Sequence, residues 1–300
     1  MISIDHQIIK VPECGRPTGL FIMDFDGTLL RSDRTFSGID LDALGQLGEK
    51  GVVRAIATGR SLYSFNTVDV ANLPVDFVIF SMGAGVLQKV GGKIVRKVIL
   101  EPRNAKQACK VLIDNRLDFM IHRTIPDNHK FSYFRSNRGN EDFERRLQLY
   151  NQFAVSLKDS IDGFGPATQL LAVVPDKSSH AALEKVRSDL PDFSVIRTTS
   201  PLDGKATWIE IFPSEVSKSK TAAWLAEEFN IEKNKIVSIG NDYNDLDLLE
   251  WTATSFVVDN APDDLKSRFT PVASNNNGGV AEAANRWLGD LLVTANESSS

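Results

Sequence analysis

The sequence predicts a doubly wound α/β protein, a Rossmann-like parallel-sheet core with a second α/β domain inserted into it. Up to about residue 85, apolar strands alternate with amphipathic helices, which is typical of a parallel sheet covered by helices. Between residues 86 and 205 the strands alternate more and the helices carry more charge, and the simpler pattern then returns. We therefore expect residues 1–85 and 206–300 to form one core and residues 86–205 to form the inserted domain.

Apolar runs and their end signals predict the individual elements. Residues 20–23 are four apolar residues that run on towards an Asp-Gly turn, as a buried parallel strand does. The next helix places Leu41, Leu44 and Leu47 on one face, and Gly51 ends it. In the core, helices are expected at 39–50, 61–70, 218–229 and 281–288, and further strands at 52–58, 77–81, 236–240 and 255–258. In the inserted domain, helices are expected at 104–115, 141–153 and 178–190, and strands at 169–174, 193–197 and 208–212.

The composition argues against several classes of protein. The chain has 300 residues and a formal net charge of −5, and this mild acidity is unlike a general nucleic-acid-binding surface. No stretch reaches the roughly 18 apolar residues of a membrane span, and residues 1–17 lack the pattern of a signal peptide. Cys14 and Cys109 form neither a disulfide framework nor a zinc pattern. We therefore expect a cytoplasmic enzyme that binds neither nucleic acid nor a membrane.

Two carboxylates follow the first apolar strand. Asp24 and Asp26 are two residues apart, so their side chains point to the same side of an extended chain. Like charges held together at a strand end need compensation, and a hard cation such as Mg²⁺ prefers oxygen ligands. Such a pair can also divide into a nucleophile and a general acid and base. The alternative is a polar strand end that enters an Asp-Gly turn.

The complete segment DFDGTLL at residues 24–30 resembles the opening motif of the haloacid dehalogenase-like (HAD) hydrolases. This resemblance implies that Asp24 attacks phosphorus and becomes an aspartyl phosphate. It implies that Asp26 protonates the leaving oxygen and then activates water, while its backbone carbonyl binds the metal. The resemblance also implies that Asp24 ligates the metal and contacts the phosphate.

Two further motifs of the same family can be recognised. ATGR at residues 57–60 resembles the second motif, so that Thr58, with Gly59 beside it, is expected to bind a phosphate oxygen. Thr58 can instead cap a helix, and Arg60 either helps to bind the anion or is a solvated helix residue. VSK at residues 216–218 resembles the third motif, and Lys218 is expected to neutralise Asp24 and the phosphate at a helix N-terminus.

The fourth motif departs from the family pattern. SIGNDYND at residues 238–245 resembles a Gly-Asp-x-x-Asn-Asp segment in which the first Asp ligates Mg²⁺. Alignment on Gly240 places Asn241 at that position, and Asn offers one neutral carbonyl oxygen in place of a carboxylate. Asp242 is the alternative ligand if the loop shifts by one residue. Asp245 keeps its place in the motif and is expected near the metal or Lys218.

Later segments resemble the Cof-like branch of the family, which has a large α/β cap. These segments are VDNA at 258–261 and NNGGVA at 276–281, and the insertion lies where that branch places its cap. Met82 stands where the branch has Asn. We therefore expect Met82, Gly83 and Ala84 to contact a substrate that differs from those of the branch, or that binds in a different pose. In the cap, His129 and Arg135 are candidate substrate contacts, with strand and loop packing as the alternative.

The resemblance implies a Mg²⁺-dependent phosphomonoester hydrolase that acts on a small phosphorylated metabolite, with a sugar phosphate as the expected class. A phosphomutase on the same core and a non-catalytic protein that binds a phosphorylated ligand are the alternatives. The sequence leaves the choice between a monomer and a dimer undecided.

Overall fold

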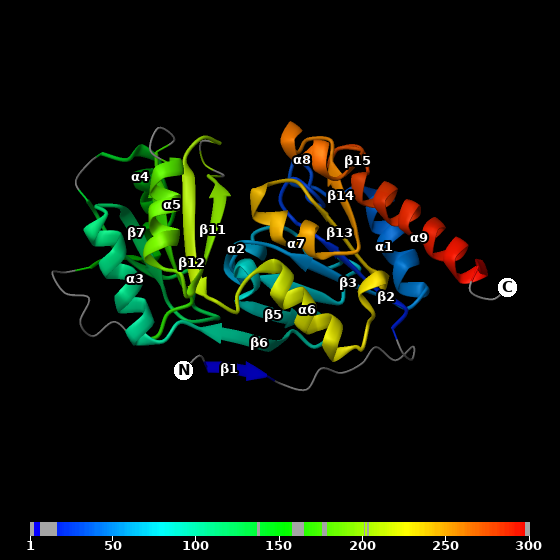
Figure 1. Cartoon of the computed structure of the whole chain (residues 1–300), viewed down its shortest axis with the longest axis horizontal. Helices are drawn as coiled ribbons and strands as arrows, with labels where there is room; N and C mark the ends of the chain where they lie inside the picture. The colour runs from blue at the N-terminus through cyan, green and yellow to red at the C-terminus, as the bar shows by residue number, and fades with distance from the viewer. Residues whose placement is uncertain are drawn as a thin grey trace. The chain divides into compact units, whose positions relative to one another are not determined.

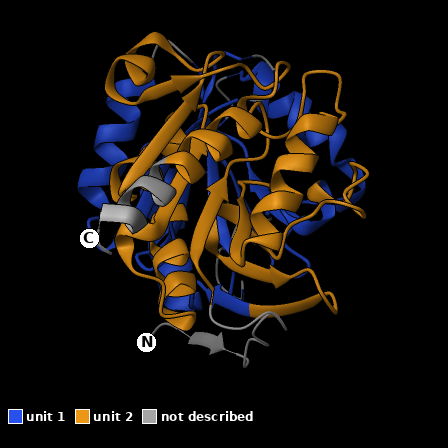
Figure 2. Cartoon of the chain, turned by 90° about the vertical axis from the view of Figure 1, so that its right-hand side faces the viewer, with its two compact units in different colours: residues 1–6, 61–64, 96–217 blue, residues 7–60, 65–95, 218–300 orange. Residues whose placement is uncertain are grey.

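The computed structural model describes residues 3–6, 17–136, 139–157, 165–175, 179–200, 202 and 204–297 (Figure 1). Cys14 lies outside the described residues. The described chain divides into two compact units (Figure 2). The core unit comprises the described residues of 7–60, 65–95 and 218–300, and the insert unit those of 1–6, 61–64 and 96–217.

The core unit is built on a parallel sheet. Six parallel strands lie in the order β4-β3-β2-β13-β14-β15, and β5 pairs antiparallel with β4. The neighbouring β2 and β13 are far apart in the chain, as crossover connections in a doubly wound sheet require. The bounds are β2 (Gly19–Met23), β3 (Val52–Ala57), β4 (Phe77–Phe80), β5 (Gly85–Gln88), β13 (Ile236–Gly240), β14 (Thr254–Val258) and β15 (Thr270–Val272).

Helices cover the sheet on both sides. Leu20 and Ile22 of β2 belong to the same buried cluster as Leu225 of α6, whereas Phe21 contacts the ring of Trp287 in α9, with ring centroids 6.1 Å apart. Because alternate side chains of β2 are buried on opposite faces, the strand is apolar throughout. The core helices are α1 (Gly38–Glu49), α6 (Lys218–Glu228), α7 (Leu246–Trp251), α8 (Asp263–Arg268) and α9 (Gly279–Glu297), and the single turn α2 (Leu62–Phe65) lies where the chain passes from the insert unit to the core unit.

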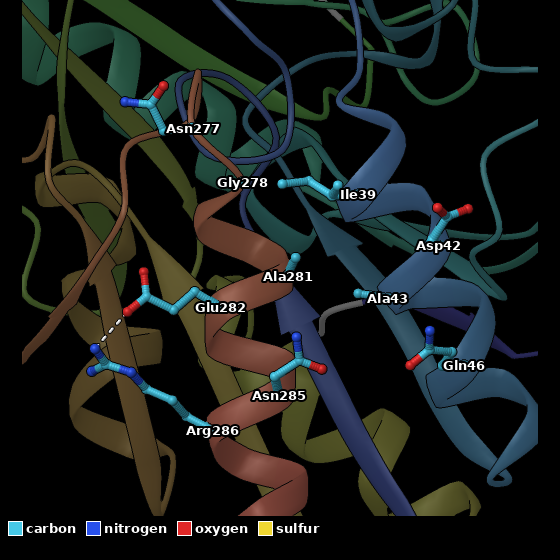
Figure 3. Close-up of a pocket in the computed structure, with 10 residues that line it drawn as sticks. All are labelled: Ile39, Asp42, Ala43, Gln46, Asn277, Gly278, Ala281, Glu282, Asn285 and Arg286. Atoms are coloured by element: carbon cyan, nitrogen blue, oxygen red, sulfur yellow. Dashed lines mark hydrogen bonds and ion pairs between the residues drawn. The ribbon is translucent and has the colours of Figure 1, made fainter.

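A surface groove of about 620 Å³ lies along α1 and α9 (Figure 3). Ile39 on one side and Ala281 on the other contribute to its lining, and Glu282 forms an ion pair with Arg286 at 2.5 Å along α9. None of the residues that line it belongs to the site expected from the sequence. The groove therefore belongs to the helical layer of the core unit.

The insert unit contains a six-stranded sheet in the order β11-β12-β10-β7-β8-β9. Its strands are antiparallel except for the parallel pair β8 and β9. One face packs with α3 and α5 around Phe119, and the other packs with α4 around Met120. The bounds are β7 (Asp118–His122), β8 (Phe131–Phe134), β9 (Ala154–Ser156), β10 (Gln169–Val174), β11 (Phe193–Thr199), β12 (Thr207–Pro213), α3 (Pro102–Asp114), α4 (Glu141–Leu149) and α5 (Ser179–Asp189).

Two further strands, β1 and β6, pair with each other. β1 (Ser3–His6) pairs antiparallel with residues 96–99 of β6 (Lys93–Ile99) within the insert unit. Among the described residues, no helix combines the length and apolar character needed to cross a membrane.

Candidate active site

The candidate site lies at the carboxyl ends of neighbouring parallel strands of the core unit. Asp24 follows β2, and its backbone N–H donates to the carbonyl of Ile239 in β13 at 2.9 Å. Thr58 follows β3, and its N–H donates to the carbonyl of Ile79 in β4 at 2.8 Å. Asn241 follows β13. This edge is where ligands bind in open α/β sheets, and the topology brings together residues from both ends of the chain.

A buried cation links two carboxylates at this edge. Lys218, the first residue of α6, donates from Nζ to Asp24 Oδ1 at 2.6 Å and to Asp245 Oδ1 at 2.5 Å. The three side chains are 0%, 5% and 0% exposed, respectively. One positive charge therefore faces two negative charges in a place that bulk water does not reach, and the group as a whole favours a further cation or a hydrogen-bond donor.

Burial has opposite consequences for the two partners of this ion pair. Burial, with the nearby charge of Asp245, raises the pKa of Asp24 to about 7, although Lys218 acts to lower it. Burial alone would lower the pKa of Lys218, but the two carboxylates outweigh it and raise that pKa above its ordinary value. Lys218 therefore stays a cation, and the charge of Asp24 depends on what lies beside it.

Asp245 organises the loop that follows β13. Its Oδ2 accepts hydrogen bonds from the backbone N–H groups of Asn241 at 2.8 Å and Asp242 at 3.1 Å. Gly240 is needed here because a Cβ at that position would lie 2.6 Å from Asp245 Oδ2. Asp242 Oδ1 accepts from the N–H of Tyr243 at 2.8 Å, as the cap of the following turn. Asp242 is thus engaged with the backbone, while Asp245 fixes both the loop and Lys218.

Asn241 reaches the oxygens of the first motif. The hydroxyl of Thr28 lies 3.2 Å from Asn241 Oδ1 and 3.2 Å from Asp24 Oδ2, as donor to either. The Asp26 carbonyl oxygen is also within 3.0 Å of the Asn241 amide. A carboxylate oxygen, a backbone carbonyl and a side-chain amide oxygen can therefore converge, and such oxygens suit a hard cation. The residues present fit Mg²⁺, although no group of three or more His, Cys, Asp and Glu side chains able to hold a metal occurs in the described chain.

The Asp26 side chain pairs with Arg60. Arg60 donates from Nε to Asp26 Oδ2 at 2.8 Å and from Nη2 to Oδ1 at 2.6 Å, and its guanidinium lies 5.2 Å from the ring centroid of Phe25. These two hydrogen bonds fix the orientation of the Asp26 carboxylate. The side chain of Asp26 is 50% exposed, so it remains open to a substrate. Arg60 therefore contacts the acid expected to transfer protons.

Thr58 and its neighbours form a compact turn. The Thr58 hydroxyl oxygen accepts from the N–H of Arg60 at 3.1 Å, which leaves the hydroxyl proton for an anion. Met82 packs against Gly59 so closely that a Cβ on Gly59 would lie 2.6 Å from Met82 Cε. The Met82 N–H donates to the Thr58 carbonyl at 3.1 Å. Met82 thus supports the turn at Thr58 through packing.

The turn after β4 is backed by α6. The Gly83 carbonyl accepts from the hydroxyl of Thr221 at 2.9 Å, and Ala84 is fully buried. Ser81 and Met82 both adopt positive φ, 50° and 56°, a conformation that costs free energy for residues other than Gly and is concentrated at functional sites. The turn is therefore held in place from two sides.

Three asparagines brace the loop that follows Asp26, and none of them was predicted to do so. Asn260 Nδ2 donates to the Gly27 carbonyl at 2.8 Å, and Asn275 Nδ2 donates to the Leu30 carbonyl at 3.0 Å. The Asn275 N–H in turn donates to Asn260 Oδ1 at 3.0 Å. Asn276 Oδ1 accepts from the Ser32 N–H at 3.0 Å. Asn260 and Asn276 lie in the segments that resemble the Cof-like branch, which was the available signal, whereas nothing in the sequence singles out Asn275.

His129 and Arg135 belong to the insert unit. The His129 ring stacks on Tyr63 with centroids 4.5 Å apart and meets the edge of Phe153 at 4.7 Å. Arg135 forms two hydrogen bonds with Glu144, at 2.8 and 2.9 Å. Both side chains therefore have packing or ion-pair partners within their own unit.

Comparison with known proteins identifies the family. A family model described as haloacid dehalogenase-like hydrolase matches residues 21–283.

The chain belongs to the haloacid dehalogenase-like hydrolases.

Curated HAD relatives are similar over most of their length. A 5-amino-6-(5-phospho-D-ribitylamino)uracil phosphatase, YwtE of Bacillus subtilis, is 25% identical over 283 residues, which cover 86% of this chain and 94% of that protein. A putative phosphatase of Haemophilus influenzae is 23% identical and covers the same shares of the two chains, 86% and 94%. With the family match, these relatives identify the chain as a phosphatase of the HAD type.

Solved structures show the same fold. BT1666, a HAD phosphatase from Bacteroides thetaiotaomicron, superposes with a TM-score of 0.73 at 19% identity, over 93% of this chain and 98% of that chain. The HAD subclass IIB sugar phosphatase BT4131 gives a TM-score of 0.69 at 17% identity, over 90% and 99%. The predicted α/β fold class is confirmed by these neighbours.

Proposed function

We propose that this HAD phosphatase is a Mg²⁺-dependent phosphomonoester hydrolase that works through an aspartyl phosphate on Asp24. The observation that carries the proposal is the buried Lys218, which contacts both Asp24 and Asp245, with Asp26 two residues beyond the nucleophile. A buried Lys fixed by two carboxylates holds the Asp24 carboxylate in place as the proposed nucleophile.

The residues divide the reaction into two steps. An Asp24 oxygen forms a bond to phosphorus while the bond from phosphorus to the leaving oxygen breaks, and Asp26 gives its proton to that oxygen. Asp26 then accepts a proton from water, which attacks phosphorus and releases Asp24 and phosphate. Lys218 and the hydroxyl of Thr58 bind phosphate oxygens throughout. When bound, Mg²⁺ would neutralise negative charge on the phosphate, held by Asp24, the Asp26 carbonyl and Asn241.

Asn241 is the proposed third ligand in preference to Asp242. Its amide lies beside the Asp26 carbonyl and Asp24 Oδ2, whereas Asp242 accepts from the backbone of the next turn. We propose Asp245 as the residue that positions Lys218 and this loop. The proposed metal ligands are therefore Asp24, the Asp26 carbonyl and Asn241, out of the larger set expected from the sequence.

The substrate proposed is a small phosphorylated metabolite, with a sugar phosphate as the first class to test. The support is the likeness to a sugar phosphatase structure together with the phosphorylated ribityl compound in the name of a relative. We further propose that residues 86–205 act as a cap that selects the substrate and residues 1–85 and 206–300 as the catalytic core. His129 and Arg135 of the cap, and Met82, Gly83 and Ala84 of the core, remain proposed substrate contacts.

A panel of sugar, nucleotide and aryl phosphates, assayed for phosphate release with and without Mg²⁺, tests the proposal. We expect turnover of at least one ester that EDTA removes and Mg²⁺ restores. If isomeric sugar phosphates form without release of phosphate, the protein is a phosphomutase. Absence of turnover with tight binding of a phosphorylated compound would support a binding protein instead.

A further inference from the structure

The two faces of the insert sheet differ in polarity. The face that packs with α3 and α5 buries apolar side chains of β7, β10 and β12. On the opposite face the same strands place polar side chains next to apolar ones, since alternate residues of a strand point to the same side. These buried polar side chains are His122, Gln169 and Glu210, and they lie two residues from Met120, Leu171 and Trp208, respectively. Buried polar groups need hydrogen-bonding partners, so a group that lacks one is a place where a ligand can bind.

The carboxylates on this face already have their partners. Glu210 accepts from Gln169 and Thr198, both at 2.9 Å. Asp142, which α4 contributes, accepts two further hydrogen bonds from neutral donors, both at 2.8 Å. Neither carboxylate therefore depends on a ligand for its hydrogen bonds.

Arg146 of α4 lies on the same face without such partners. Its Nε donates to Met120 Sδ at 3.3 Å, and its guanidinium carbon lies 4.4 Å from the ring centroid of Trp208 and 5.2 Å from that of Tyr150. Within the described chain, its two terminal nitrogens make no hydrogen bond and no carboxylate oxygen lies within 4.0 Å of them. Two aromatic rings thus hold a half-buried guanidinium in place, and its terminal N–H groups are left as donors.

His122 supplies the complementary group. Its side chain is buried, and Nδ1 lies 2.8 Å from the Asn128 carbonyl, which can only accept, so Nδ1 carries the ring proton. Burial and then the charge of Arg146 lower the pKa of His122 to about 3, so the ring is neutral. Its Nε2 is therefore an acceptor, and among the described residues it has no donor. Arg146 and His122 lie on either side of Met120, one with spare donors and one with a spare acceptor.

We propose that Arg146 and His122 form a subsite of the insert unit that binds hydroxyl groups of the leaving group of the phosphate ester. A hydroxyl accepts a hydrogen bond from the guanidinium and donates one to His122 Nε2, so hydroxyls on neighbouring carbons complete both side chains. This inference rests on the proposed function in taking residues 86–205 as the cap. It goes beyond that function in naming the part of the substrate that the cap binds and the residues that bind it.

The charges around the subsite favour neutral hydroxyls over a second anionic group. Asp142 and Glu210 place two negative charges near the single positive charge of Arg146. A carboxylate or a second phosphate on the substrate would bring a further negative charge next to two buried carboxylates, whereas a hydroxyl brings none. The expected substrates are therefore monophosphate esters of polyols or neutral sugars, and bisphosphates and phosphorylated sugar acids are disfavoured.

Calorimetric binding to full-length Asp24→Asn, which should bind esters without turning them over, tests the proposal. The probes are three six-carbon esters, all measured with Mg²⁺: sorbitol 6-phosphate, n-hexyl phosphate, which lacks the hydroxyls, and 6-phosphogluconate, which adds a carboxylate. We expect the dissociation constant of sorbitol 6-phosphate to be at least about tenfold below that of n-hexyl phosphate. We expect 6-phosphogluconate to bind no more tightly than sorbitol 6-phosphate.

Variants in the same background assign the preference to the subsite. Arg146→Met should reduce the difference between sorbitol 6-phosphate and n-hexyl phosphate to within about threefold and leave the binding of n-hexyl phosphate unchanged. Arg146→Lys keeps the charge near the two carboxylates but loses the planar pair of donors, so it should also reduce the difference even if Arg146→Met does not fold. Arg145→Met, at the exposed neighbouring position of α4, is the matched control and should change none of the three dissociation constants.

Each contrary result has a distinct meaning. If both Arg146 variants keep the full preference for sorbitol 6-phosphate, or if 6-phosphogluconate binds more tightly than it, the subsite does not bind neutral hydroxyls. If the wild type hydrolyses n-hexyl phosphate as efficiently as sorbitol 6-phosphate, the proposed phosphatase function stands and this inference fails. If none of the three esters binds or is hydrolysed, both fail.

Discussion

The core unit and the insert unit both bury charged side chains, but they satisfy them in different ways. In the core unit, Lys218 must serve two carboxylates at once. In the insert unit, the buried Asp142 accepts from the hydroxyl of Ser200 and the indole N–H of Trp208, both at 2.8 Å. Likewise, Glu210 accepts from Gln169 and Thr198, both at 2.9 Å.

This difference separates polar groups that stabilise the fold from polar groups that can bind a ligand or take part in a reaction. A buried carboxylate with its own neutral donors is complete and holds strands and helices together. In the core unit the cation bonds directly to both carboxylates at the carboxyl edge of the parallel sheet, and such a group is poised to receive a ligand. Burial also lowers the pKa of His122 in the insert unit to about 3, so the ring stays neutral, with Nδ1 next to the Asn128 carbonyl at 2.8 Å.

The largest expected effect concerns the nucleophile. Asp24→Asn keeps the shape of the side chain but removes its charge, so phosphate release should fall by more than about a hundredfold. The matching change in the insert unit, Asp142→Asn, should leave kcat within about threefold and lower the free energy of unfolding by about 1–3 kcal/mol. Phosphate release and urea unfolding measure the two. A loss of turnover in both variants would contradict the proposal that the buried carboxylates of the core unit act in catalysis and those of the insert unit only in stability.

Removing the shared cation should destabilise more than removing one neutral hydrogen bond. Lys218→Met leaves two buried carboxylates without their ion-pair partner, which should cost about 3–5 kcal/mol of unfolding free energy in EDTA. Glu210→Gln in the insert unit keeps an acceptor for one of its two donors and should cost about 1–2 kcal/mol. Equal costs in denaturant titrations would argue that the core group is no less satisfied than the insert group.

A third comparison concerns Arg60. Asp26→Asn should slow alkyl phosphates by about 10²- to 10⁴-fold and activated aryl phosphates less, because a good leaving group needs little protonation. Arg60→Gln should change the same ratio of alkyl to aryl rates, since Arg60 contacts the acid directly. In the double variant, Arg60→Gln should then add little to the loss of rate caused by Asp26→Asn. If Arg60→Gln alone instead raises KM equally for all esters, Arg60 binds phosphate.

The smallest effect is a pH dependence in the insert unit. The folded-state pKa of His122 is lowered to about 3, whereas the ring has an ordinary pKa of about 6.5 in the unfolded chain. The unfolded chain binds the proton between these values, so the stability from a neutral His122 is lost as the pH falls below about 6.5. At pH 5 the loss should be about 2 kcal/mol relative to pH 7. His122→Gln should remove this slope in urea unfolding measured at both pH values.

Local patterns predicted most of the parallel core, because strands such as β2, β4 and β13 are apolar runs buried on both faces. The short strand β15, with two exposed residues, was not expected. Local patterns predicted the structure less well where contacts between distant parts of the chain determine it. The helix expected at 61–70 is only a single turn, α2, because residues 61–64 and the chain after them belong to different units. The insert strands β7 and β8 were not expected, although Pro126, Asp127 and Asn128 between them are residues typical of a turn. The motif residues were named from their resemblance, but the contact between Arg60 and Asp26 and the contacts of Asn241 with the first motif depend on distant parts of the chain.

The chain separation within the site has a consequence for protein synthesis. Thr28 and Asn241 are 213 residues apart, and a ribosome adding about 5–20 residues per second needs roughly 10–40 s to cover that distance. During this interval β2 can pair with β3 but not with β13, so the most apolar strand of the core has one open edge, which invites pairing with other chains. The emergence of residues 218–241 from the ribosome therefore ends the period of greatest exposure for the nascent chain.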